Sequence, residues 1–365
     1  MGKRIIIAGG GTGGHIFPAI AIANALKKAD SSIEILFVGA KGKMEMEKVP
    51  QAGYKIEGLD IAGFNRSSLI KNTSLPFKLI KSFFQVRSIF KAFKPDAVIG
   101  VGGYSSFPVL RLAQSKGMPS FIHESNSFAG KSNILLGKKA TAVFTGTDGM
   151  EKFFPPEKIL VTGNPVRASI AQSMVSKAEG CEHFSLDEKK KTLLVIGGSL
   201  GAKSINEAID QHLDELLGAG LQLIWQTGKP YAAKAEVSVA GKSAVWVNDF
   251  ITKMEYAYAA ADIVVARAGA MTVAELCVVK KPVLFVPYPY AAEDHQTVNA
   301  TQLVNKQAAL MIKDSEAIDK VVPMAIALAA DENKQAELKK NIAALAITDA
   351  DKIIAEAILK KLNAK

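Results

Sequence analysis

The residues with the clearest chemistry stand in two glycine-rich turns. Residues 9–15 (GGGTGGH) follow the apolar run 4–8, and residues 197–202 (GGSLGA) follow the apolar run 193–196. Glycine adopts positive φ and has no Cβ to block close approach, so such turns let backbone N–H groups and a helix N-terminus face an anion. No acidic residue follows at the end of a clear second strand, as a dinucleotide site requires, and the Gly-Lys-Ser/Thr of a P-loop is absent, which argues against a simple dehydrogenase or ATPase. Two such turns predict two nucleotide-fold halves.

His15 and Glu124 are the candidates for acid–base chemistry. An imidazole titrates near neutral pH and suits a general base that deprotonates an acceptor hydroxyl. A histidine in a turn also serves as a structural hydrogen-bonding group, and the residues alone leave both interpretations open. Glu124 either orients a base or an acceptor, or caps a helix.

Polar stretches follow nearly every apolar run. In open α/β sheets, ligands bind beyond the carboxyl ends of the strands. A single polar stretch is an ordinary turn, but six aimed at one crevice indicate a ligand site. The stretches are 100–106, 123–126, 163–167, 248–251, 267–275 and 287–296.

Parallel sheets must position these residues, because the apolar runs alternate with helical patterns. The runs are mostly continuous, which predicts strands that are covered on both faces. In the first half the predicted strands are 4–8, 35–38, 97–101, 120–123, 142–145 and 159–162. In the second half they are 192–196, 221–226, 244–247, 263–266, 283–286 and 309–312. The predicted fold class is α/β.

Length and composition predict two globular domains. The chain has 365 residues, of which 48% are hydrophobic and 22% charged. We expect one domain over 1–165 and a second over 166–346, with a C-terminal helix over 347–365 that packs back on the first. The net charge of +10 favours an anionic partner. With two cysteines we expect no disulfide framework, and we expect neither a signal peptide nor a membrane-spanning helix.

Six motifs, in a fixed order, resemble those of the MurG family of bacterial glycosyltransferases. The resemblance covers nearly the whole chain, and the combination is specific although each motif alone is weak. It implies a GT-B fold, in which two Rossmann-like domains face each other across a cleft. The motifs are GGGTGGHIFP at 9–18 (with Gly11 as an extra glycine), GGY at 102–104, HESN at 123–126, GNPVR at 163–167, GGSLGA at 197–202 and RAGAMTVAE at 267–275.

This resemblance implies an inverting transferase that moves N-acetylglucosamine from UDP-N-acetylglucosamine (UDP-GlcNAc) to lipid I, which is undecaprenyl-pyrophosphoryl-N-acetylmuramoyl-pentapeptide. The product is lipid II of peptidoglycan synthesis. The family needs no metal and no other cofactor, and no cluster in this sequence has a convincing metal-ligand spacing. The implied location is peripheral, on the cytoplasmic side of the cell membrane.

The resemblance also assigns site residues. His15 is implied as the base, with Glu124 beside it in the catalytic set. Glu275 is implied to hold the ribose; without the resemblance it reads as a carboxylate favoured by the helix dipole. Ile251 is implied to read the uracil edge through its backbone. The implied donor contacts are Thr12, Gly13, Gly14, Asn126, Arg167, Ser199, Ile251, Ala270, Met271, Thr272, Val273, Ala274, Glu275 and Gln296.

Two positions depart from the family pattern. Leu200 stands where the family usually has glutamine, and Thr297 stands where it usually has the second of two glutamines. This chain lacks those two amide side chains, and we do not assign a sugar contact to Thr297.

The segment 61–94 mixes apolar and basic residues. This composition is typical of a surface that lies on anionic lipid, and a lipid-linked acceptor favours that interpretation. The alternative is a helix with a core face and a solvated basic face. The membrane and acceptor candidates are Arg66, Lys78, Lys81, Phe83 and Arg87.

The sequence is also compatible with other functions. The main alternative is another GT-B transferase, or a UDP-GlcNAc epimerase, with a soluble substrate. A nucleic-acid-binding module is disfavoured, because only 7% of the residues are aromatic and no RNA-recognition signature is present.

Overall fold

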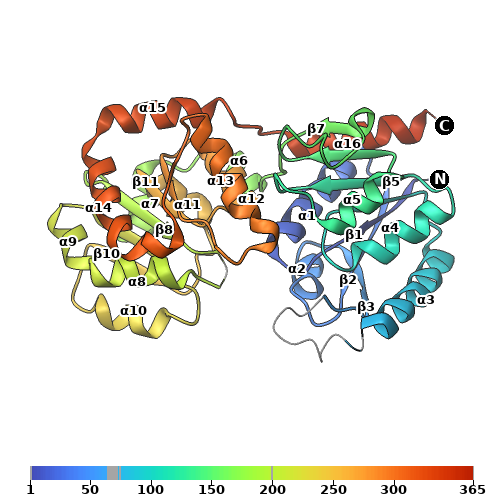
Figure 1. Cartoon of the computed structure of the whole chain (residues 1–365), viewed down its shortest axis with the longest axis horizontal. Coiled ribbons are helices and arrows are strands. Elements are labelled where there is room, and N and C mark those ends of the chain that lie inside the picture. Colours follow the sequence, from blue (N-terminus) through green and yellow to red (C-terminus); the bar gives the residue numbers. More distant parts are fainter. Residues whose placement is uncertain (1, 64–72, 74, 199, 365) are drawn as a thin grey trace. The chain divides into compact units, whose positions relative to one another are not determined.

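The chain divides into two compact units. The computed structural model describes residues 2–63, 73, 75–198 and 200–364. Unit 1 comprises Met1–Arg167 with Asp349–Lys365, and unit 2 comprises Ala168–Thr348. Each unit is a parallel sheet flanked by helices (Figure 1), which confirms the predicted α/β class.

Unit 1 contains a seven-stranded sheet in the order β3-β2-β1-β4-β5-β6-β7, and every pair of neighbours is parallel. The strand order reverses between β1 and β4, and in such sheets the ligand site lies at this switch point. The strands are β1 (Arg4–Ala8), β2 (Glu34–Ala40), β3 (Lys55–Leu59), β4 (Ala97–Gly100), β5 (Ser120–Glu124), β6 (Ala142–Thr145) and β7 (Ile159–Val161).

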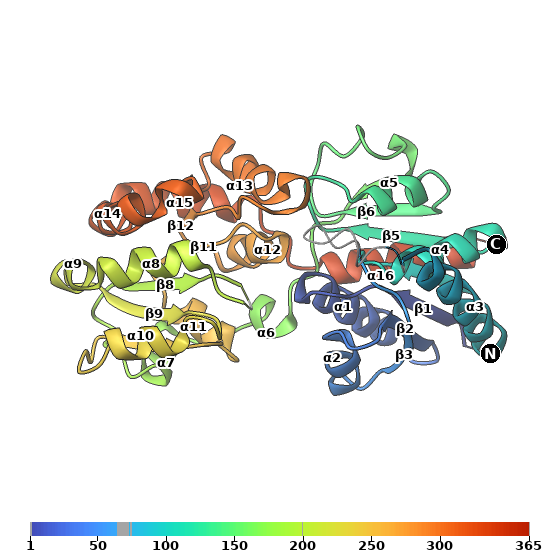
Figure 2. The same cartoon turned by 60° about the horizontal axis from the view of Figure 1, so that its bottom comes forward.

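Helices cover both faces of this sheet. On one face α16 lies beside α1 (Figure 2), and Ile354 and Ile358 of α16 share a core cluster with Ile16 and Ile22 of α1. On the other face, α3, α4 and α5 bury a second cluster that includes Val86. The helices are α1 (Gly13–Ala29), α2 (Glu45–Gln51), α3 (Leu75–Phe93), α4 (Ser106–Ser115), α5 (Lys131–Gly137) and α16 (Ala350–Asn363), with the short turn η2 (Pro156–Lys158).

Unit 2 repeats the plan with a six-stranded sheet in the order β10-β9-β8-β11-β12-β13. Every pair of neighbouring strands is parallel, and the order reverses between β8 and β11. The strands are β8 (Thr192–Ile196), β9 (Gln222–Gln226), β10 (Val245–Asn248), β11 (Ile263–Ala266), β12 (Val283–Phe285) and β13 (Leu310–Met311).

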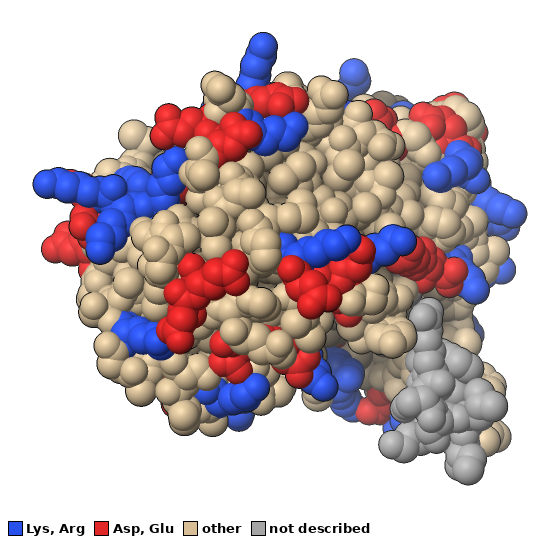
Figure 3. Space-filling view, turned by 60° about the vertical axis from the view of Figure 1, so that its left-hand side comes forward, with Lys and Arg blue, Asp and Glu red and all other residues tan. Residues whose placement is uncertain are grey.

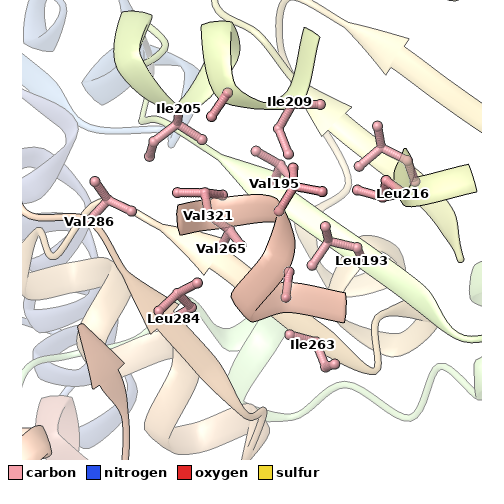
Figure 4. Packing of buried hydrophobic residues seen from close by; sticks show 14 of the residues in the cluster. Leu193, Val195, Ile205, Ile209, Leu216, Ile263, Val265, Leu284, Val286 and Val321 are labelled. Carbon is pink, nitrogen blue, oxygen red and sulfur yellow. The ribbon is translucent and has the colours of Figure 1, made fainter. Parts of the chain in front are cut away.

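The core of unit 2 lies between this sheet and its helices. Figure 4 shows Val195 and Val265 of the strands packed against Ile205 of α8 and Val321 of α14. The helices are α6 (Ala168–Ala171), α7 (Lys177–His183), α8 (Lys203–Gln211), α9 (Leu213–Gly218), α10 (Ala232–Ser238), α11 (Met254–Ala260), α12 (Ala270–Val279), α13 (His295–Asn305), α14 (Ala317–Ala330) and α15 (Glu332–Ala343), with the short turns η3 (Ala292–Asp294) and η4 (Asp314–Glu316).

All twelve predicted strands are present, with ends that differ by at most a few residues. A thirteenth strand, β3 (Lys55–Leu59), was not predicted, because its residues Lys55 and Glu57 interrupt the apolar pattern. It is the terminal strand of its sheet and pairs with β2 alone. An edge strand tolerates charged residues that a central strand would not.

The surplus of basic residues is spread out on the face that Figure 3 shows, where acidic and basic side chains are interspersed. No helix among the described residues combines the length and the apolar character needed to cross a bilayer.

Candidate functional site

The glycine turns after β1 and β4 interlock at the switch point of unit 1. The amide of Gly10 donates to the carbonyl oxygen of Gly102 at 3.2 Å. A Cβ on Gly103 would lie 2.4 Å from the oxygen of Gly10, and Gly103 has a φ of +85°. Both the close approach and the backbone conformation therefore require glycine.

His15 is the third residue of α1 and lies against this pair of turns. Its Nδ1 is 3.0 Å from the carbonyl oxygen of Gly10. A carbonyl oxygen can only accept, so Nδ1 of the neutral ring carries the proton and Nε2 carries the lone pair. A Cβ on Gly102 would come 2.8 Å from Nε2, so the ring lies directly over that glycine. This tautomer is the one that a general base working through Nε2 requires.

Glu45 holds the first glycine turn through hydrogen bonds, a role that was not predicted from the sequence. Its side chain is 1% exposed, and its two oxygens accept from the amides of Gly11 at 2.8 Å and Ala40 at 2.9 Å. A Cβ on Gly10 would lie 2.3 Å from its carboxyl carbon. Glu45 thus fixes the turn whose carbonyl orients His15. No motif marks it, because the contact joins residues far apart in sequence.

Glu124 is buried at the end of β5, and four donors engage its carboxylate. Oε1 accepts from the backbone amide of Asn126 at 3.1 Å and from its side-chain Nδ2 at 3.4 Å. Oε2 accepts from the amide of Gly130 at 3.1 Å and from Nδ2 of Asn133 at 2.8 Å. The carboxylate therefore holds the loop between β5 and α5, and it fixes the side chain of Asn126.

His123 precedes Glu124 and is fully buried. Burial is the main cause that lowers the pKa of its imidazole to about 4. The hydrogen bond with the backbone of Gly163 raises this pKa, and the charge of nearby His15 lowers it further. Three buried side-chain atoms lack a hydrogen-bond partner within the described part of the chain: His123 Nε2, Thr145 Oγ1 and Asn164 Oδ1. They belong to residues at the carboxyl ends of β5 and β6 and just after β7.

Arg167 ends unit 1, and its guanidinium carbon lies 5.1 Å from the ring centre of Phe17 on α1. This distance is typical of a cation–π contact. Arg167, Gly13 and Gly14 are half-buried, and Thr12 is exposed at the start of α1.

The second glycine turn follows β8 in unit 2. Gly198 accepts from Nε2 of Gln226 at 2.9 Å, and a Cβ on Gly201 would lie 1.9 Å from the oxygen of Thr227. Leu200 is 78% exposed, so the residue that replaces the usual glutamine makes little contact. Ser199, which the family resemblance implies as a donor contact, lies outside the described residues.

The N-terminus of α12 follows β11 through Gly269. The first helical hydrogen bond runs from the amide of Val273 to the oxygen of Gly269 at 2.9 Å, so the amides of residues 270–272 precede the helical ladder. Residues 270–274 are half-buried, and Glu275 is 7% exposed. Its Oε2 accepts from the hydroxyl of Tyr258 at 2.9 Å.

Arg267 is the first residue of the same motif, and its guanidinium donates hydrogen bonds to other groups of the protein. Its Nη1 donates to the carbonyl of Val286 at 2.9 Å and to Asp314, and its Nη2 donates to Ser204 at 3.1 Å. The buried guanidinium thus joins the loop after β12 to α8 and η4.

The loop after β12 presents Gln296 at the start of α13. Oε1 of Gln296 accepts from the amide of Tyr288 at 3.0 Å, which leaves the amide's N–H groups as its donors. Thr297 instead donates to Asp294 at 2.7 Å. Asp294 has a φ of +52°, a conformation that favours glycine, so this loop is strained. Ile251 is buried in a separate loop, after β10.

The apolar residues of α3 divide between an exposed side and a packed side. Phe77, Ile80 and Phe84 are 76%, 57% and 67% exposed, and their spacing places them on one side of the helix. Phe83 is half-buried, with its ring centre 6.5 Å from that of Phe107, so it packs against α4.

The basic candidates on this segment are placed as follows. Lys78 and Arg87 are exposed. Lys81 lies 2.9 Å from Asp60, and its hydrogen bond, with that of Lys41, lowers the pKa of Asp60 to about 2. Arg66 lies outside the described residues. Within the described ranges no three His, Cys, Asp or Glu side chains gather as a metal site would require.

Comparisons with known proteins match both units. The model of the glycosyltransferase family 28 N-terminal domain matches residues 5–145, and that of the C-terminal domain matches residues 192–355. The chain is 50% identical over 360 residues to a protein of Phocaeicola vulgatus, which covers 98% of this chain and 96% of the relative. It is 50% identical over 366 residues to a protein of Bacteroides thetaiotaomicron, and the match covers 99% of this chain and 98% of that relative. Both are named UDP-N-acetylglucosamine–N-acetylmuramyl-(pentapeptide) pyrophosphoryl-undecaprenol N-acetylglucosamine transferase.

Solved structures of known proteins share the fold of this chain. The crystal structure of Acinetobacter baumannii MurG has a TM-score of 0.79 at 29% identity and covers 98% of this chain and 99% of its own. A UDP-N-acetylglucosamine 2-epimerase has a TM-score of 0.69 at 16% identity, with coverage of 100% and 98%, and shares the fold alone.

Proposed function

The chain belongs to glycosyltransferase family 28 and, within it, to the MurG enzymes of the GT-B fold, and from this membership we infer that it converts lipid I to lipid II. The sugar transferred is N-acetylglucosamine, and the donor is UDP-GlcNAc. The observation that carries this conclusion is 50% identity over 98% of the chain to a relative of that name.

In the reaction, a hydroxyl oxygen of the acceptor sugar attacks the anomeric carbon of N-acetylglucosamine. The bond from that carbon to the diphosphate breaks, and UDP leaves with the electron pair. We assign the proton released from the hydroxyl to Nε2 of His15. The hydrogen bond from Nδ1 to Gly10 supports this role, because it keeps the lone pair on Nε2.

Unit 2 holds the donor in this proposal. The amides of Ala270, Met271 and Thr272 precede the ladder of a ten-residue helix and suit the diphosphate, whose charge grows as it leaves. Val273 and Ala274 follow them in the same helix, and the Glu275 carboxylate accepts hydrogen bonds from the ribose hydroxyls. Gln296 donates to the sugar through the N–H groups that its contact with Tyr288 leaves.

Asn126, Glu124 and Arg167 act from unit 1. Four donors already hold the Glu124 carboxylate, so we assign it to positioning Asn126 and not to proton transfer. Arg167, held over Phe17, supplies a permanent positive charge for the diphosphate. Thr12, Gly13, Gly14, Ser199 and Ile251 keep the donor contacts that the family resemblance implies.

We also propose that α3 rests on the cytoplasmic leaflet of the membrane. Its exposed Phe77, Ile80 and Phe84 offer apolar area, and Lys78 and Arg87 of the same helix are exposed and can interact with anionic lipid. Each basic residue near such a surface is worth about 1 kcal/mol, so binding needs several groups together. This placement brings the enzyme to its lipid-linked acceptor.

The test is a product assay. The protein is incubated with UDP-GlcNAc and lipid I in detergent, and a lipid-linked disaccharide is expected by mass spectrometry. UDP-GlcNAc alone is the matched control and should be recovered unchanged. Epimerised UDP-sugar in the control, without a disaccharide in the full reaction, contradicts the transferase and supports the alternative.

A further inference from the structure

Tyr258 is a buried tyrosine that has no assigned role in the reaction. It lies on α11, is 1% exposed, and donates from its hydroxyl to Oε2 of Glu275 at 2.9 Å. The ring is among the largest fully buried side chains of the structure, so the surrounding core fixes its position. Its hydroxyl is therefore a donor held at a set point beside a carboxylate.

A carboxylate that recognises two hydroxyl groups at once must present its oxygens in one orientation. A glutamate side chain has several rotatable bonds, and holding them costs conformational entropy when a ligand binds. A donor fixed by core packing removes part of that cost in advance. The hydrogen bond from Tyr258 restricts the rotation of the Glu275 side chain and sets the direction of Oε2.

We propose that Tyr258 is a positioning residue of the nucleoside site, and that recognition of the two ribose hydroxyls by Glu275 depends on it. The inference rests on the proposed function, which assigns Glu275 to the ribose. It predicts that removal of the Tyr258 hydroxyl weakens binding only of nucleotides that carry ribose hydroxyls.

The decisive variant is Tyr258→Phe, which removes one oxygen and keeps the buried ring. Tyr256→Phe is the matched control, because Tyr256 lies on the same helix and its ring packs 4.8 Å from that of His183. Calorimetry gives the affinities of both variants, the parent and Glu275→Ala for UDP and for 2′,3′-dideoxyuridine diphosphate. Melting temperatures establish that each variant is folded.

We expect Tyr258→Phe to weaken UDP binding by about tenfold, the usual size for a hydrogen bond to a charged group, and to change dideoxy-UDP binding by less than about twofold. In turnover assays, KM for UDP-GlcNAc should rise while kcat at saturating donor stays close to that of the parent. Tyr256→Phe should match the parent in every measurement.

Three results would overturn the proposal. Equal weakening of UDP and dideoxy-UDP by Tyr258→Phe would mean that the hydroxyl supports only the fold. Unchanged UDP affinity in Tyr258→Phe, with weaker binding in Glu275→Ala, would remove Tyr258 and leave the ribose assignment standing. Unchanged UDP affinity in Glu275→Ala would remove that assignment as well, while the lipid II assay judges the transferase separately.

Discussion

Nδ1 of His15 and the carbonyl oxygen of Gly10 are 3.0 Å apart, five residues from each other in the chain. The contact closes the glycine turn on itself and fixes which ring nitrogen holds the proton. Catalytic chemistry at Nε2 therefore depends on the backbone of the turn as well as on the histidine.

His15→Ala should lower turnover with lipid I by about 10² to 10⁴, the range for loss of a general base, and should leave UDP affinity almost unchanged. His212→Ala, at a residue of unit 2 paired with Glu215, is the control. A His15→Ala enzyme that keeps most of its turnover would make His15 a structural residue.

Glu275→Ala should weaken UDP binding by about 1 to 3 kcal/mol, because the ribose hydroxyls and Tyr258 lose a buried partner. Calorimetry measures the change, and Glu236→Ala on the exposed side of α10 is the control. Equal affinities for the parent and Glu275→Ala would exclude the ribose contact.

Glu45→Gln should destabilise the protein by about 1 to 3 kcal/mol, because a buried amide cannot accept from both Gly11 and Ala40 without turning an N–H toward one of them. Urea unfolding measures this loss. Glu47→Gln, exposed on the same helix, should have little effect. If the two variants unfold at the same urea concentration, Glu45 does not support the turn.

His123 should make the stability of the protein depend on pH. Its pKa of about 4 in the folded state lies below the ordinary value of 6.5, so between these values the unfolded chain binds more protons than the folded one. The contribution is fully present above pH 6.5 and declines as the pH falls toward 4. Between pH 7 and pH 5 the loss amounts to about 2 kcal/mol.

The measurement compares unfolding free energies of the parent and His123→Gln at pH 7 and pH 5. The parent should lose more stability than the variant over this interval. The ring signals of His123 in NMR spectra should also stay unchanged down to pH 5. A titration midpoint near 6.5 would contradict the burial argument.

Changing Phe77, Ile80 and Phe84 together to Ser should reduce sedimentation with anionic vesicles, because these side chains supply the exposed apolar area of α3. Changing Lys78 and Arg87 to Ser should weaken binding more visibly at low salt. Met174→Ser with Val237→Ser, which also removes exposed apolar side chains, is the control. Equal sedimentation of all four proteins would remove the membrane assignment from α3.

The sequence predicted those elements and motifs best that depend only on residues close together in the chain. Buried parallel strands such as β1 and β8 are continuous apolar runs, and the order of six motifs was enough to identify the family, which the comparisons confirm. Glu45 and Tyr258 were missed, because each acts through a contact with a residue distant in sequence. Phe83 is half-buried while Phe77, Ile80 and Phe84 are exposed, a difference that composition alone does not predict.

The order of the units along the chain has a consequence for biosynthesis. Residues 350–363 form α16, which completes the core of unit 1, yet the ribosome makes them only after all of unit 2. During translation, Ile16 and Ile22 of α1 lack their packing partners until Ile354 and Ile358 are made. Both of these partners are fully buried in the folded protein. The N-terminal unit is therefore the last to be completed, and a nascent chain stalled before residue 350 leaves an apolar stripe of α1 open to chaperones and proteases.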